Sequence, residues 1–313
     1  MSSPSSAPIN ASIRFQAVTY RVDGTPTQAT NSTGQSAGVR GTGVPSARVR
    51  AAGGLTLVCD IALAVETGET VVLLGRSGSG KTTMLRLINR MLEPTSGEVL
   101  VEGRATTKWD AIKLRRGIGY VIQEAGLFPH FTVAENIALV PTLEKWDERR
   151  IAARVQELLE LVGLDSGDFA RRYPRQLSGG QRQRVGVARA LAADPQILLM
   201  DEPFGALDPV TRAELQREFG ALAKRLGKTI VFVTHDLREA LLLATRIVLL
   251  EGGRIVAQGT PENFLQQKHP EVRAFASCLD TEDAADADVA NGDAAAIKFA
   301  SGRKVGNEGG EQA

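Results

Sequence analysis

The chain has 313 residues, of which 43% are hydrophobic and 23% are charged, which suits one large α/β domain or two small ones. Its 37 lysines and arginines balance 36 aspartates and glutamates, so no overall charge attracts nucleic acid or an anionic membrane surface. Cys59 and Cys278 are far apart and have no metal-ligand spacing, which excludes a disulfide framework and favours a reducing compartment.

The sequence carries no membrane or secretion signal that we can identify. No apolar run approaches the ~20 residues that span a bilayer. The first residues lack the basic and apolar regions of a secretory signal. We therefore expect a protein of the cytoplasm that reaches a membrane only through a protein partner.

The first 65 residues alternate between polar and strand-like segments. Residues 1–11 are expected to be a flexible leader, and the alternation over 13–20 is typical of an edge strand. Residues 23–54 are rich in Gly, Ser, Thr and Pro, which predicts a flexible insertion. Two short strands are then expected, at 55–58 and 61–65.

A phosphate-binding loop is predicted after the strand at 70–74. A glycine-rich turn between a β-branched run and a helical pattern lets backbone N–H groups surround an anion at a helix N-terminus. A glycine-rich surface turn could match this pattern by chance, but both flanking elements fit. Lys81 would contact the β- and γ-phosphates, and the Thr82 hydroxyl would bind Mg²⁺. The predicted loop comprises Gly75, Arg76, Ser77, Gly78, Ser79, Gly80, Lys81, Thr82 and Thr83.

The middle of the chain changes from strands to helices. Strands are expected at 97–101 and 118–122, followed by a polar loop. Thr132 and Glu135 form a capping-box pattern, and apolar residues of 151–162 fall on one helical face. We therefore predict an inserted α-helical subdomain at about 125–185.

Strands return in the last third of the chain, at 197–200, 229–233 and 246–250. Their near-continuous apolar character indicates a parallel sheet covered on both faces. Asp208 and Pro209 are expected to begin a helix that Gly227 ends. Residues 280–313 are rich in Ala, Asp and Gly and are expected to be a disordered tail.

Two further segments suit nucleotide chemistry. Asp201 ends a buried strand, where a carboxylate is costly without a cation, and Mg²⁺ shared with Thr82 would be that partner. Glu202 could act as general base for the attacking water, although two acids can also simply cap a strand. The residues Ser178, Gly179, Gly180 and Gln181 begin a helix and form a second anion site without a lysine, or else a plain linker.

These segments together resemble the ATPase domains of ATP-binding cassette (ABC) proteins. The phosphate loop, Gln123, residues 177–181, Asp201-Glu202, residues 205–208 and His235 follow the order of that family over about residues 12–275. The resemblance implies a P-loop NTPase core with a mainly parallel sheet, an N-terminal antiparallel β subdomain and the inserted helical subdomain. It also implies that two copies close head to tail around two ATP molecules, each between one phosphate loop and the partner's Ser178 region.

The resemblance also assigns roles to single residues. Gln123 would contact Mg²⁺ or the attacking water, and His235 would contact the γ-phosphate and position Glu202. Mg²⁺ would then be held by Thr82, Gln123 and Asp201. The family usually stacks adenine on an aromatic side chain at the position of Val22 here, so we keep Tyr20, two residues earlier, as a weak candidate.

Within the family, residues 118–141 and 200–212 look like the importers of quaternary amines and osmoprotectants such as glycine betaine, carnitine, choline and proline. The implied partners are a second copy, membrane permease subunits and, indirectly, an extracytoplasmic solute-binding protein, with no nucleic acid. The chain would lie on the cytoplasmic face of the plasma membrane. The alternatives are the ATPase of another importer and a soluble cassette that acts in DNA repair or on ribosomes.

Overall fold

The structure is a computed structural model that describes residues 11–23, 50–51, 54–123, 125–277 and 279. The chain divides into a compact unit that ends at Phe264 and a second unit that begins at Leu265. In the second unit, residues 270–277 are helical. No helix in the described ranges is long and apolar enough to cross a membrane.

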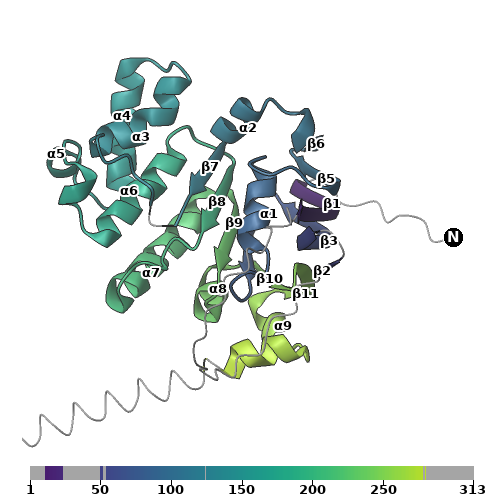
Figure 1. The fold of residues 1–313 in the computed structure, drawn as a ribbon. Helices are drawn as coiled ribbons and strands as arrows, with labels where there is room; N and C mark the ends of the chain where they lie inside the picture. The colour runs from purple at the N-terminus through teal and green to yellow at the C-terminus, as the bar shows by residue number, and fades with distance from the viewer. Residues whose placement is uncertain (1–10, 24–49, 52–53, 124, 278, 280–313) are drawn as a thin grey trace, which may run out of the picture. The chain divides into compact units, whose positions relative to one another are not determined.

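One sheet of the larger unit is antiparallel, with strand order β2-β3-β1-β5-β6 (Figure 1). β1 pairs with β3 on one side and with β5 on the other, so the expectation of an edge strand is wrong. Its alternation instead reflects a sheet with one buried and one solvated face, because Ile13 and Phe15 are buried while Gln16 is exposed. The strands are β1 (Ala11–Asp23), β2 (Arg50–Ala51), β3 (Gly54–Glu66), β5 (Ser96–Val101) and β6 (Arg104–Ala105).

The two short strands expected at 55–58 and 61–65 are one strand, β3. The break in the pattern marks an irregularity in the pairing with β1, where Asp60 has a φ of 52° and its N–H donates to Thr19 Oγ1 at 3.0 Å. Asp23, Gly54 and the short β2 belong to strands, although we expected a flexible segment there. The rest of that segment, the first ten residues and the tail from 280 lie outside the described residues.

The second sheet has the order β11-β10-β4-β9-β8-β7 and is parallel except for β11, as the apolar runs predicted. In its register, Leu74 pairs with Thr234 and Asp201 pairs with Val233. The segments that follow β4, β8 and β9 therefore begin at the same edge of the sheet, where these parallel strands have their carboxyl ends. The strands are β4 (Thr70–Leu74), β7 (Ile118–Val121), β8 (Ile197–Asp201), β9 (Thr229–Thr234), β10 (Arg246–Glu251) and β11 (Arg254–Gly259).

The core joins both sheets through the first helix, α1. One hydrophobic cluster contains side chains of β1, β3, β5, α1 and the central parallel strands. Met84, Leu85, Leu87 and Ile88 of α1 are fully buried in it. The antiparallel sheet therefore holds the helix that follows the phosphate loop. Besides the helical residues 270–277, the α-helices outside the helical subdomain are α1 (Lys81–Ile88), α2 (Ala111–Gly117), α7 (Pro209–Leu226), α8 (Leu237–Leu243) and α9 (Pro261–Leu265).

The remaining helices gather beside the β7 edge of the parallel sheet (Figure 1). Thr132 accepts from the N–H of Glu135 at 3.2 Å, and Glu135 accepts from the N–H of Thr132 at 2.7 Å, which confirms the expected capping box. Val155, Leu158 and Leu159 form the buried face of the following helix. These helices are α3 (Val133–Leu143), α4 (Glu148–Leu161), α5 (Ser166–Phe169) and α6 (Gly179–Leu191).

Candidate functional site

The loop from Gly75 to Gly80 joins β4 to α1, as predicted. Gly80 has a φ of 105°, and a Cβ there would lie 2.6 Å from the carbonyl oxygen of Leu57. Only glycine therefore fits where the loop enters the helix. Ser79 is buried, and its Oγ has no hydrogen-bond partner among the described residues. A buried hydroxyl without a partner in a loop of this kind suits a polar ligand.

Lys81 projects back over this loop. Its Nζ donates to the carbonyl oxygens of Gly75 at 2.7 Å and Arg76 at 3.0 Å, and the residue is only 4% exposed. Burial lowers the pKa of Lys81, and the charges of Glu202 and Asp201 partly oppose that effect. Among the residues that the structure describes, this buried ammonium has two carbonyl partners and no direct carboxylate contact, so it is suited to an added anion.

Asp201 and Thr82 meet across the edge of the sheet. The Thr82 hydroxyl donates to Asp201 Oδ1 at 2.8 Å, and the Tyr120 hydroxyl lies 3.5 Å from Oδ2. Burial raises the pKa of Asp201 and, together with the Asp201 charge, raises the pKa of Tyr120 to about 12. A carboxylate and a hydroxyl side by side are oxygen ligands of the type that Mg²⁺ binds, so the pair fits that ion.

Glu202 and His235 form the next pair along this edge. His235 Nδ1 lies 3.3 Å from Glu202 Oε2; the His235 side chain is 61% exposed and that of Glu202 is 24% exposed. Glu202 has a φ of 44°, and its N–H donates to the carbonyl oxygen of Val233 at 3.0 Å. Strained backbone of this kind is concentrated at functional sites. The pair joins a carboxylate to an imidazole that can orient it.

Gln123 lies two residues after β7, the strand beside β8. Val121 pairs with Met200, so the chain reaches Gln123 at the edge where Asp201 lies. Its side chain is exposed and makes no hydrogen bond that the described residues record. Contact of Gln123 with Mg²⁺ or the attacking water stays a prediction.

The segment Ser178 to Gln181 begins α6 in the helical subdomain. The Gln181 N–H donates to Ser178 Oγ at 3.2 Å, and the Ser178 N–H donates to Gln181 Oε1 at 2.9 Å. These two side chains therefore close a capping box on each other. The structure joins the phosphate loop, Asp201, Glu202 and His235 at one sheet edge, and it places the second predicted anion site on a separate helix.

Comparison with known proteins identifies the family. The sequence profile described as "ABC transporter" matches residues 58–205. The glycine betaine uptake system ATP-binding protein YehX of Escherichia coli (strain K12) is 56% identical over 208 residues, which are 66% of this chain and 67% of YehX. The chain belongs to the ABC transporter ATP-binding family.

Two further relatives show how much of the cassette is shared. The glycine betaine/carnitine/choline transport ATP-binding protein OpuCA of Bacillus subtilis (strain 168) is 53% identical over 214 residues, 68% of this chain but 56% of OpuCA. The chain thus spans little more than half the length of such relatives. A dimeric post-hydrolysis structure of the ATP-binding cassette MJ0796, bound to ADP and Pi, is 32% identical with a TM-score of 0.63, and covers 80% of this chain and 98% of that one. These matches confirm the predicted fold class.

Tyr20 of the cassette, the weak candidate for adenine stacking, lies on β1 opposite Val58. Its ring is partly buried and packs against the hydrophobic core cluster. Val22, where the family pattern expects an aromatic residue, is 42% exposed. Tyr20 therefore has a structural contact of its own, and adenine stacking on it stays a prediction.

A buried polar cluster behind His235 was not expected from the sequence. The Thr234 hydroxyl donates to Glu239 Oε2 at 2.5 Å, and Gln216 Nε2 donates to Glu239 Oε1 at 2.8 Å. Glu239 is 4% exposed, and burial raises its pKa. A cavity of about 30 Å³ lies between Glu239, Arg212, Glu202 and His235. The cluster holds the end of β9, which is followed directly by His235. Tyr120 is a second residue of the site that no sequence motif predicted.

Proposed function

We propose that the chain is the ATP-hydrolysing subunit of a bacterial importer for a small solute, a quaternary amine or osmoprotectant such as glycine betaine. The observation that carries the proposal is the Glu202–His235 pair, 3.3 Å apart, on the same sheet edge as the Thr82–Asp201 pair. A general base, an orienting imidazole and two oxygen ligands beside a phosphate loop suit hydrolysis of a nucleoside triphosphate. The solute class rests on the names of relatives that are 53–56% identical.

Each side chain has one task in this scheme. Lys81 and the loop amides bind phosphate oxygens, while Thr82, Asp201 and Gln123 hold Mg²⁺. Bound Mg²⁺ would neutralise negative charge on the phosphates. Glu202 accepts the proton of the attacking water, and His235 orients Glu202 through its ring nitrogen.

The partners follow from the family. A second copy would supply its Ser178 segment to the phosphates that this chain's Lys81 holds. Membrane permease subunits would dock on the cassette, and an extracytoplasmic binding protein would deliver the solute to them. The protein would then lie on the cytoplasmic face of the plasma membrane through its permease.

Solute uptake in cells that lack this protein tests the proposal. We expect reduced accumulation of at least one of radiolabelled glycine betaine, choline, carnitine and proline, restored by the wild-type chain but not by Glu202→Gln. Unchanged uptake of all four would contradict the solute class. Recovery of the tagged chain with ribosomes or DNA instead of a membrane protein would contradict the transport role.

A further inference from the structure

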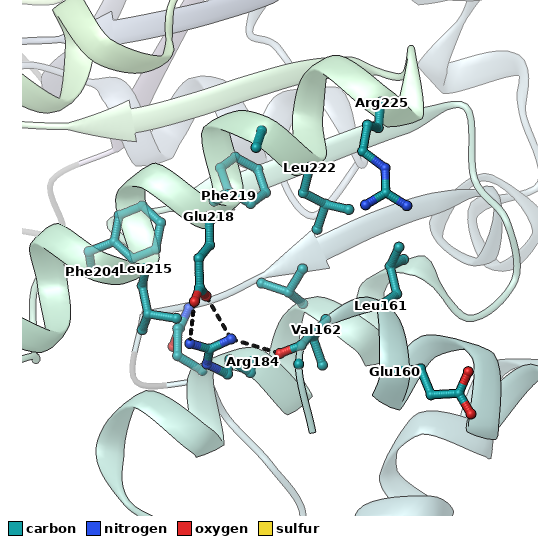
Figure 2. A pocket seen from close by; sticks show the side chains of 14 residues that line it. Glu160, Leu161, Val162, Arg184, Phe204, Leu215, Glu218, Phe219, Leu222 and Arg225 are labelled. Carbon is teal, nitrogen blue, oxygen red and sulfur yellow. Dashed lines mark hydrogen bonds and ion pairs between the residues drawn. The ribbon is translucent and has the colours of Figure 1, made fainter. Parts of the chain in front are cut away.

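A cavity of about 320 Å³ lies where the helical subdomain meets α7 (Figure 2). The end of α4, one side of α6, the α7 helix and Phe204 form its walls. In Figure 2, Leu215 and Leu222 point from α7 toward the side where Val162 and Arg184 lie. The volume is in the range of small-molecule pockets, which begins at about 300 Å³.

The interior of this cavity is mostly apolar. Phe204 is 2% exposed, Leu215 and Phe219 are 5% exposed, and Val162 is 6% exposed. These side chains are therefore shielded from bulk water, yet they border a space that no side chain of the described residues fills. Such a surface favours a hydrocarbon or aromatic group over water.

One buried amide nitrogen in the cavity wall has no hydrogen-bond partner among the described residues. Gln183 is 4% exposed, and its Nε2 makes no hydrogen bond within the described residues. A buried amide without an acceptor is unfavourable, and native structures seldom keep one without a reason. An oxygen atom of a bound molecule would satisfy it.

The charges around the cavity cancel. Arg184 pairs with Glu218 at 2.6 Å and donates to the carbonyl oxygen of Val162 at 2.8 Å. Glu160 accepts from Gln156 Nε2 at 3.0 Å. Arg225 is the second guanidinium of the rim, so two positive and two negative side chains line the cavity. The cavity therefore suits an uncharged molecule better than an ion.

We propose that this cavity binds a small uncharged molecule with an apolar body and an oxygen acceptor that receives the Gln183 amide. The molecule would contact α6, which begins directly after Ser178, and Phe204, which lies two residues after Glu202. It would thus contact both the helical subdomain and the segment that follows Glu202, the proposed general base. The site shares no lining residue with the phosphate loop.

Methyl NMR of the full chain with two matched probes tests the site. The probes are 2-acetylnaphthalene, which has a carbonyl oxygen, and 2-ethylnaphthalene, which has the same shape without it. We expect saturable shifts at the methyl groups of Val162, Leu215 and Leu222, with a dissociation constant on the order of 1 mM for the ketone. The hydrocarbon should bind about fivefold more weakly because it leaves the Gln183 amide without an acceptor.

Three variants separate the parts of the proposal. Gln183→Leu should bind both probes equally, whereas Gln156→Leu, an exposed glutamine outside the cavity, should keep the fivefold preference. Val187→Phe should fill the cavity and abolish the shifts, while the methyl spectrum outside the cavity shows that it folds. Absence of shifts in the wild-type chain, unchanged binding to Val187→Phe, or a preference that survives Gln183→Leu would overturn the assignment.

Discussion

The phosphate loop and the Ser178 segment are both glycine-bearing sequences that begin a helix, yet the structure uses them differently. Lys81 bonds to carbonyls of its own loop, and Thr82 reaches Asp201, which is 119 residues away in sequence. The side chains of Ser178 and Gln181 each accept from the other residue's backbone N–H, and they make no other hydrogen bond recorded among the described residues. The first is a site that the sheet assembles within one chain. The second is a local cap. Its use in an ATP site shared with a second copy is our proposal and rests on the family to which the chain belongs.

Loss of the base at the assembled site should have the largest effect. Glu202→Gln keeps the size and one acceptor but cannot take a proton, so we expect ATP turnover to fall about 1000-fold. ATP binding should be retained, and an ATP-bound dimer should accumulate. Phosphate release and light scattering measure the two effects. Glu214→Gln, an exposed acid on α7, is the control, and wild-type turnover in Glu202→Gln would remove Glu202 from this role.

Removal of the Lys81 charge at the phosphate loop should have the second-largest effect. Lys81→Ala deletes the ammonium that contacts Gly75 and Arg76, and the phosphates lose a charge-assisted partner. We expect ATP affinity to fall about 10- to 100-fold in a binding titration. Lys108→Ala, an exposed lysine, should leave the affinity unchanged. Equal affinity in both variants would contradict the assignment of this loop.

Two substitutions at Ser178 separate its local and intermolecular roles. Ser178→Ala should lower the free energy of unfolding by about 1 kcal/mol because the helix loses its cap. Ser178→Asp should keep the stability, since aspartate caps equally well, but its carboxylate would repel a triphosphate held by the partner copy. In the Glu202→Gln background, light scattering should show no ATP-driven dimer for Ser178→Asp. A normal dimer there would show that the cap is purely local.

The smallest expected effect concerns the cluster behind His235. Burial raises the pKa of Glu239 in the folded chain, so the stabilisation is complete below the ordinary value near 4.5 and is lost as pH rises through the folded pKa. Glu239→Gln removes this titration while keeping an acceptor for Gln216. The variant should gain stability relative to wild type as pH rises above about 4.5, measured by urea unfolding at several pH values. Glu98→Gln, an exposed acid on β5, should follow the wild-type curve.

Features of the fold that depend on local sequence could be predicted, whereas those that depend on distant pairing could not. The parallel strands, the phosphate loop and the helix between Asp208 and Gly227 follow from local apolar runs, turn residues and caps. The position of β1 between β3 and β5 depends on pairing partners far along the chain, which alternation alone does not specify.

The same reasoning applies to the site. Asp201, Glu202 and His235 each follow an apolar strand, so topology predicts that they meet. Gln216 and Glu239 lie 23 residues apart on different helices, and no spacing links them before α7 and α8 pack. From the sequence, Tyr120 is an ordinary strand residue. Its place beside Asp201 follows only from the pairing of β7 with β8.

The carbonyl oxygen of Leu57 lies beside two glycines, Gly80 and Gly253. A Cβ on Gly80 would lie 2.6 Å from it, and a Cβ on Gly253 would lie 2.7 Å from it. The Cys59 N–H also donates to the carbonyl oxygen of Gly253 at 2.8 Å. Both glycines therefore lie against the β3 backbone where a side chain has no room, so a displacement of the loop at Gly80 would be transmitted to β3. A fluorescent label on the solvated face of the antiparallel sheet would test whether ATP binding moves β3.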